Sequence, residues 1–131
     1  MSMSMRDNKI SANSMIESVI NDTKIWIKNN FYKDLNSNVV SSRSGYTRWY
    51  FQRSFSKKEG ISLKNYIQKT RVEVAIHDIM HSDLSFNKIS CSHGFNSVHT
   101  FLRAVKKIHG MTPSELRKHH QTEEISENNV P

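Results

Sequence analysis

Residues 45–55 read GYTRWYFQRSF, and residues 94–105 read GFNSVHTFLRAV. After one inserted residue the two stretches match at an offset of fifty, so that Phe51 matches Phe101 and an arginine follows two residues later in both. Each copy begins at a turn glycine and is followed five residues later by a second glycine. A short helix, a glycine turn and a second, amphipathic helix make up the helix-turn-helix pattern. The internal repeat therefore predicts two helix-turn-helix units in tandem.

Each copy of the repeat separates apolar from polar residues. Phe51 and Phe55 share one face of the first predicted helix, and Phe101 and Val105 share one face of the second, because residues four apart lie above one another on a helix. We expect these four side chains to be buried. The opposite faces carry Trp49, Gln52, Arg53 and Ser56 in the first copy, and His99, Leu102, Arg103 and Lys106 in the second.

The flanking sequence predicts further helices on both sides of each copy. Ile16, Ile20 and Ile27 recur at helical spacing and predict a helix that runs to about Phe31. The longest helix is predicted over residues 62–81, where neither glycine nor proline interrupts the pattern. Its inward side chains are predicted to be Leu63, Tyr66, Ile67, Val74, Ala75, Ile79 and Met80.

Capping signals predict where the later helices begin. Ser85 can cap a short helix, and either Asn96 or Ser97 can cap the next one. Residues 112–115, Thr-Pro-Ser-Glu, have the composition of a capping box with proline at the first helical position. Since the chain has only four Gly and two Pro, few turns are obligatory and we expect an all-α protein without a sheet.

These patterns divide the chain into five parts. We expect a disordered N-terminal tail (1–14), a first helix-turn-helix lobe (15–61), a linker helix (62–81), a second helix-turn-helix lobe (82–120) and a disordered C-terminal tail (121–131). Both tails are polar and poor in large apolar side chains, so neither can contribute much to a core.

Composition limits the classes of partner. Nineteen Lys+Arg against twelve Asp+Glu give a formal charge of +7, which attracts polyanions. No apolar run approaches the roughly 20 residues that span a bilayer, and the N-terminus lacks the apolar stretch of a signal peptide. We therefore expect a cytoplasmic protein that does not bind membranes. The single cysteine, Cys91, cannot form an internal disulfide.

The outer faces of the two predicted helices carry side chains suited to DNA. Arginine can bond guanine O6 and N7 together, and glutamine can bond an adenine edge in the same paired way. Lysines at the far ends of both helices are placed for phosphates: Lys57, Lys58, Lys106 and Lys107.

At this level of detail the chain resembles the AraC/XylS family of transcription regulators, and within it the single-domain MarA/SoxS group. The likeness rests on Trp26-Ile27, residues 43–53, Tyr66-Ile67, Arg71 and the stretch from Gly94 to Pro113, and it covers about residues 15–119. It implies about seven helices, in two three-helix lobes joined by a long central helix. The two recognition helices, at roughly 47–58 and 96–107, are expected to enter major-groove segments roughly 34 Å apart.

The resemblance also implies a biological role. Such proteins bind an asymmetric double-stranded DNA site as monomers and activate antibiotic-resistance, efflux and stress promoters through contact with RNA polymerase. The chain has no room for the effector-binding domain of larger members, so we expect no small-molecule effector. We also expect no cofactor and no bound metal. The resemblance places the protein at the nucleoid in the bacterial cytoplasm.

Site residues carry over position by position. The base-contacting set implied by the resemblance is Trp49, Gln52, Arg53, Val98, His99, Thr100, Leu102 and Arg103. The phosphate-contacting set is Thr47, Arg48, Lys57, Lys58, Asn96, Lys106 and Lys107. The second helix departs from the family pattern, because Val98 and His99 stand where MarA-like members have two glutamines and Leu102 replaces a threonine. Val98 and Leu102 can touch thymine methyls but cannot make paired hydrogen bonds.

Three other functions compete with this interpretation. An enzyme would use Cys91 with His93, or a metal held by His77 and His81. We expect Cys91 to be a half-buried side chain that serves packing. Two imidazoles are too few ligands for a zinc site. An RNA-binding or architectural module is the second alternative, although paired projecting helices gain little from the narrow major groove of RNA. A membrane-binding amphipathic protein is the third, and the inward aromatics argue against it because the core needs them.

Overall fold

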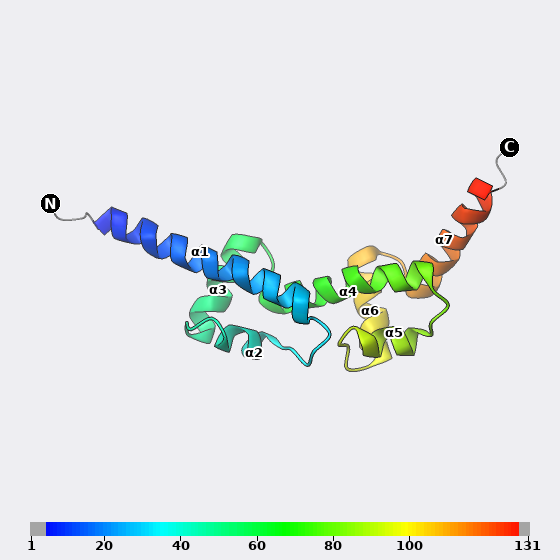
Figure 1. Ribbon diagram of the computed structural model, residues 1–131, viewed down its shortest axis with the longest axis horizontal. Coiled ribbons are helices and arrows are strands. Elements are labelled where there is room, and N and C mark those ends of the chain that lie inside the picture. Colours follow the sequence, from blue (N-terminus) through cyan, green and yellow to red (C-terminus); the bar gives the residue numbers. More distant parts are fainter. Residues whose placement is uncertain (1–4, 129–131) are drawn as a thin grey trace. The chain divides into compact units, whose positions relative to one another are not determined.

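The computed structural model describes residues 5–128, with side chains from residue 12 to residue 125. Over that range the chain forms seven α-helices and no strand, which confirms the predicted all-α fold (Figure 1). None of the helices in this range combines the length and the apolar character that a bilayer crossing requires. The helices are α1 (Met5–Asn30), α2 (Ser37–Ser42), α3 (Arg48–Glu59), α4 (Leu63–His81), α5 (Phe86–Ser92), α6 (Val98–His109) and α7 (Pro113–Asn128).

The described chain divides into two compact units, and each has a hydrophobic core of its own. The first unit comprises the chain up to Asn30 together with Leu35–Ile67, and the second comprises Phe31–Asp34 and the chain from Gln68 onward. One copy of the repeat therefore lies in each unit, as α2 and α3 in the first and as α5 and α6 in the second.

The core of the first unit forms beneath α3. Phe51 and Phe55 are completely buried, as the sequence predicts, and their ring centroids lie 6.2 Å apart. Helix α1 contributes the predicted stripe of Ile16, Ile20 and Ile27 to the same cluster. Burying a side chain of this size stabilises the fold by about 1.5–3 kcal/mol relative to exposing it. Burial of Phe51 and Phe55 therefore fixes which face of α3 points toward the core.

The core of the second unit repeats this arrangement. Phe101 and Val105 are completely buried beneath α6, again as predicted. Ile89 of α5 and Phe95 of the turn join them, and the Phe95 and Phe101 rings meet edge to face at 5.1 Å. The two copies of the repeat therefore bury equivalent faces of their second helices.

The inward face of α4 differs from the prediction at one position. Val74 is 40% exposed rather than buried, and Val72 is completely buried instead. Val72, Ala75 and Ile79 lie three and four residues apart and share one stripe, whereas Val74 points about 100° away from Ala75. Met80 and Tyr66, also expected inside, are half-buried.

Side-chain caps start the helices where the sequence indicates. The side-chain hydroxyls of Thr47, Ser85 and Ser97 each accept a hydrogen bond from the backbone amide three residues on, at 3.2, 3.1 and 3.1 Å. Ser97 rather than Asn96 is thus the cap of α6. The predicted capping box is also present, since the Glu115 amide donates to Thr112 Oγ1 at 3.1 Å and the Thr112 amide donates to Glu115 Oε2 at 3.2 Å.

Both end helices extend beyond the boundaries expected from the sequence. Helix α1 begins at Met5 and α7 continues to Asn128, so residues 5–14 and 121–128 are helical where we expected tails. Neither segment contains glycine or an internal proline, and adding residues to an existing helix costs far less than nucleating one. The expectations for residues 1–4 and 129–131 lie outside the described residues.

The two turn glycines of the repeat differ in their surroundings. Both have positive φ, +81° at Gly45 and +84° at Gly94. A Cβ added at Gly94 would lie 2.6 Å from the Phe31 carbonyl oxygen and 2.9 Å from Arg71 Nε, whereas nothing lies within 4 Å of one added at Gly45. Arg71 is not free to move away, because it donates to the carbonyls of Phe31 and Lys33, both at 2.9 Å. Gly94 is therefore required by packing as well as by φ.

We expect Gly94→Ala to destabilise the protein by more than about 2 kcal/mol, roughly twice the cost of Gly45→Ala. Both substitutions force a Cβ into the left-handed region, at about 1–2 kcal/mol, but only the first also drives a Cβ against the Phe31 carbonyl. Urea unfolding of the two variants measures the difference, and Gly45→Ala is the matched control. Equal destabilisation would show that the contact at Gly94 adds nothing to the cost of its φ.

Candidate nucleic-acid interface

The exposed face of α3 presents an aromatic ring paired with a guanidinium group. Trp49 is 67% exposed, and the Arg53 Cζ lies 5.0 Å from the centre of the Trp49 ring. Single exposed apolar side chains are common on protein surfaces, so it is the contact with Arg53 and not its exposure that distinguishes Trp49. This is a cation-π contact, and because Arg53 is exposed its guanidinium donors are accessible to a base edge or a phosphate.

Gln52 lies beside this pair and is held by α2. Its side-chain nitrogen donates to Ser41 Oγ at 3.1 Å, and that hydroxyl donates in turn to the Ser37 carbonyl at 2.6 Å. An amide group has two N–H donors and one carbonyl oxygen, so one donor and the acceptor are left over. These are the two groups that a paired contact with an adenine edge uses. The short helix α2 therefore orients a residue of α3.

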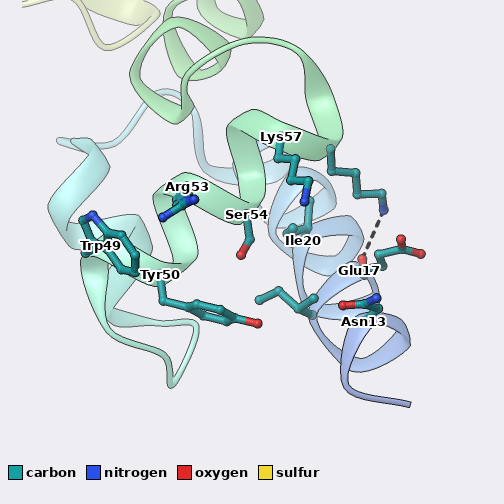
Figure 2. Close-up of a pocket in the computed structure, with 10 residues that line it drawn as sticks. Asn13, Glu17, Ile20, Trp49, Tyr50, Arg53, Ser54 and Lys57 are labelled. Atoms are coloured by element: carbon teal, nitrogen blue, oxygen red, sulfur yellow. Dashed lines mark hydrogen bonds between the residues drawn. The ribbon is translucent and has the colours of Figure 1, made fainter. Parts of the chain in front are cut away.

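A groove of about 480 Å³ lies next to this face, between α1 and α3 of the first unit (Figure 2). Trp49, Tyr50 and Arg53 line it from α3, and α1 contributes Ile16 and Ile20. The lining includes a single carboxylate, that of Glu17, and no histidine or cysteine. The lining therefore lacks the combination of imidazole, thiolate and carboxylate ligands that a zinc site uses.

The two lysines at the end of α3 differ in their contacts. The Lys58 ammonium group donates to the Glu17 carbonyl at 3.3 Å and to Asn21 Oδ1 at 2.8 Å, so it is bound to α1. Lys57 is exposed. Next to them, Lys24 and Glu59 form an ion pair at 2.6 Å, and the hydrogen bond from Lys24 to Glu59 raises the pKa of Lys24. Both lysines are exposed, and Lys58 is the one of the two predicted phosphate contacts whose ammonium group is bonded to α1.

Helix α6 presents a different set of side chains. His99 and Arg103 are exposed and Val98 is half-buried. Thr100 Oγ1 lies 3.0 Å from Ser97 Oγ, so this hydroxyl is engaged with the helix cap. Leu102, which the sequence placed on the outer face, is half-buried and packs against the core of the second unit.

The remaining predicted phosphate contacts lie at the surface. Thr47, Arg48, Asn96, Lys106 and Lys107 are exposed. Exposure is what a phosphate contact requires, and the contacts themselves stay predictions. The Thr47 hydroxyl also caps α3, so the Thr47 backbone amide lies at the N-terminus of this helix, which is the positive end of the helix dipole.

The thiol-histidine pair weighed as an enzyme site has no catalytic arrangement. His93 is buried, its Nδ1 bonds the Ile89 carbonyl at 2.7 Å, and its Nε2 lies 3.5 Å from Asp78 Oδ2. Both ring nitrogens are therefore used in packing the second unit. Cys91 is exposed, which corrects the expectation that it would be half-buried.

A second histidine cluster was missed by sequence reasoning. His81, at the end of α4, lies with His120 and Glu124 of α7, and their ligand atoms are all within 4.8 Å of one another. The spacing of four between His120 and Glu124 is visible in the sequence, but nothing there shows that α7 meets the end of α4.

Known proteins are similar to this chain in sequence and in fold. Residues 40–119 match a protein-family model described as a helix-turn-helix domain, which is more than half of the chain. The chain belongs to the AraC-type helix-turn-helix family. It is similar to the TetD protein of transposon Tn10 from Escherichia coli, with 35% identity over 100 residues that cover 76% of this chain and 72% of TetD.

Two further relatives of this AraC-type chain cover most of its folded part. The HTH-type transcriptional activator AarP of Providencia stuartii is 31% identical over 100 residues, 76% of this chain and 74% of AarP. The regulatory protein SoxS of Escherichia coli K12 is 31% identical over 101 residues, 77% of this chain and 94% of SoxS. The chain is therefore a DNA-binding AraC-type transcription regulator, from a family of regulators rather than enzymes.

Solved structures agree on the fold. The DNA-binding domain of AdpA in complex with a target DNA matches with a TM-score of 0.75 at 18% identity, over 79% of this chain and 94% of that one. The C-terminal domain of AraT from Geobacillus stearothermophilus matches with a TM-score of 0.72 at 25% identity, over 76% of this chain and 84% of that one.

We expect Lys57→Gln to make DNA binding less dependent on salt. The slope of log K against log salt concentration should fall in magnitude by about one unit, because neutralising one phosphate fewer releases one counterion fewer. Lys58→Gln should leave the slope nearer to wild type, since the Lys58 ammonium is bonded to α1. Fluorescence anisotropy with a labelled duplex at several salt concentrations measures both slopes. An equal drop for the two variants would mean that Lys58 leaves α1 to bind phosphate.

Proposed function

We propose that this AraC-type chain binds an asymmetric duplex site as a monomer, with α3 and α6 in successive major-groove segments, and activates resistance and stress promoters through contact with RNA polymerase. The observation that carries the proposal is the pair of twelve-residue helices Arg48–Glu59 and Val98–His109. Each buries one face and starts at a hydroxyl cap, and each ends at a left-handed glycine. The name of AarP as a transcriptional activator supports the direction of regulation.

The asymmetry of the site follows from the different faces of the two helices. Helix α3 offers the stacked Trp49–Arg53 pair and Gln52, which can make paired hydrogen bonds to guanine and adenine. Helix α6 offers Arg103 and His99 beside the apolar Val98. Two unlike faces on one chain read two unlike half-sites, so the operator needs no two-fold symmetry and the protein needs no second copy.

Affinity and sequence choice come from different side chains in this proposal. The formal charge of +7 and the exposed Lys57, Lys106 and Lys107 supply phosphate attraction, which is independent of sequence and weakened by salt. Contacts from the two exposed helix faces supply the discrimination between sites.

Arg53→Ala should weaken binding to a cognate duplex by about 1–3 kcal/mol, roughly 5- to 150-fold, with a much smaller effect on random duplex DNA. The reason is that a paired contact with a guanine exists only at the cognate site. Anisotropy titrations with the two duplexes at fixed salt measure the ratio. Equal weakening on both would show that Arg53 only neutralises phosphate.

Arg53→Lys is the matched control for charge. Lysine keeps the positive charge but cannot form the paired contact or the same planar stack on Trp49. We expect it to bind random DNA like wild type while losing most of the cognate preference. Full cognate preference in this variant would argue against paired recognition by Arg53.

Arg103→Ala, tested in the same way, examines the second helix. If α6 is inserted in the groove, binding at the cognate site should weaken by a similar amount, about 1–3 kcal/mol. Unchanged binding would mean that the first unit binds alone and that the two-helix proposal is wrong. Multi-angle light scattering of the complex then reports whether one chain or two occupy the duplex.

A further inference from the structure

A cluster of metal-ligating side chains lies in the second unit, outside the DNA-binding residues described above. His81 is the last residue of α4, and His120 and Glu124 lie one turn apart on α7. One ligand atom from each lies within 4.8 Å of the other two. His77, one turn before His81, has its ring centroid 4.7 Å from the His81 ring. Three candidate ligands from two helices therefore meet at one place, and His77 lies next to one of them.

The geometry of His120 is unusual for a structural histidine. Its ring meets the His81 ring edge to face at 4.5 Å, and its Nε2 is shielded from solvent. This nitrogen lies 3.3 Å from Glu124 Oε1, without hydrogen-bond geometry. Buried polar atoms in native proteins nearly always have a partner, so an imidazole nitrogen enclosed by a second imidazole and a carboxylate requires an explanation.

We propose that His81, His120 and Glu124 bind a divalent transition-metal ion of the zinc class. Imidazole nitrogen together with carboxylate oxygen is a donor set that suits Zn²⁺ and its neighbours, whereas Mg²⁺ and Ca²⁺ prefer oxygen alone. The ligand number also fits, because zinc sites take three or four protein ligands.

Binding needs a small adjustment of the side chains. Zinc bonds of about 2.0–2.2 Å place tetrahedral ligand atoms roughly 3.4 Å apart, which is closer than the 4.8 Å within which these atoms lie. His81 and Glu124 are exposed and can change rotamer without disturbing the core. The ion would then join the end of α4 to α7 beyond the contact already made by Arg117, which donates to the carbonyls of Ile79 at 2.9 Å and Leu84 at 2.8 Å.

The chain contains a control for this site within the same helix. His119 and Glu123 repeat the spacing of His120 and Glu124 one residue earlier, with Nδ1 and Oε1 at 3.4 Å. They do not belong to the three-residue ligand cluster found in the described part of the chain. A site made merely by a histidine and a glutamate one turn apart would use both pairs equally.

The test titrates the full chain with Zn²⁺ against a chromogenic chelator, in a Cys91→Ser background that removes the exposed thiol as a ligand. We expect one tight equivalent, a rise in melting temperature with added Zn²⁺, and about tenfold or greater weakening in His81→Ala and in His120→Ala. His119→Ala and Glu123→Gln should stay within about twofold of wild type. Far-UV circular dichroism without metal checks that each variant is folded.

Two results would overturn the proposal. One is Zn²⁺ binding by the His81→Ala/His120→Ala double variant that is as tight as that of the parent chain. The other is equal weakening in His119→Ala and His120→Ala, which would place the ion on the surface of α7 alone. Co²⁺ substitution gives an independent readout, since a four-coordinate site produces an intense visible absorption that the double variant should lack.

Discussion

Both helix faces proposed to contact DNA depend on the burial of the opposite faces of the same helices. Phe51 and Phe55 are completely enclosed beneath α3, and Phe101 and Val105 are completely enclosed beneath α6. With these pairs fixed, the 3.6-residue period of a helix determines which side chains point outward. The hydroxyl caps and left-handed glycine ends then set the length of each helix. The cores therefore determine what each unit can present to DNA.

The two copies of the repeat present different side chains on their outer faces. In the first, Trp49 supports Arg53 and α2 holds Gln52 through Ser41, so the outer face is polar and ordered. In the second, Leu102 is drawn partly into the core, which narrows the polar face of α6. The outer faces can differ without disturbing the fold because each copy buries its own pair of apolar side chains, and in the proposed function this difference changes the sequence that each helix reads.

The sequence predicts this protein well where local signals and periodicity coincide. The caps, the repeat and the buried pairs are all predictable, because each depends on residues within one or two helical turns. Prediction fails where the outcome depends on tertiary contacts or on helix propagation. Val74 is exposed rather than buried, the ends of α1 and α7 are helical rather than tails, and Cys91 is exposed rather than packed. The contact between His81 and His120 is also a tertiary contact, and no spacing in the sequence predicts it.

The most direct test is selection of bound sequences from a random duplex library of about 30 base pairs at physiological salt, long enough for two half-sites one helical turn apart. We predict two unlike motifs, separated by about one turn and without palindromy, with Arg53→Ala erasing only one of them and Arg103→Ala only the other. A single short motif, a palindrome, or no enrichment at all would contradict the claim that two unlike helices of one chain read one asymmetric site.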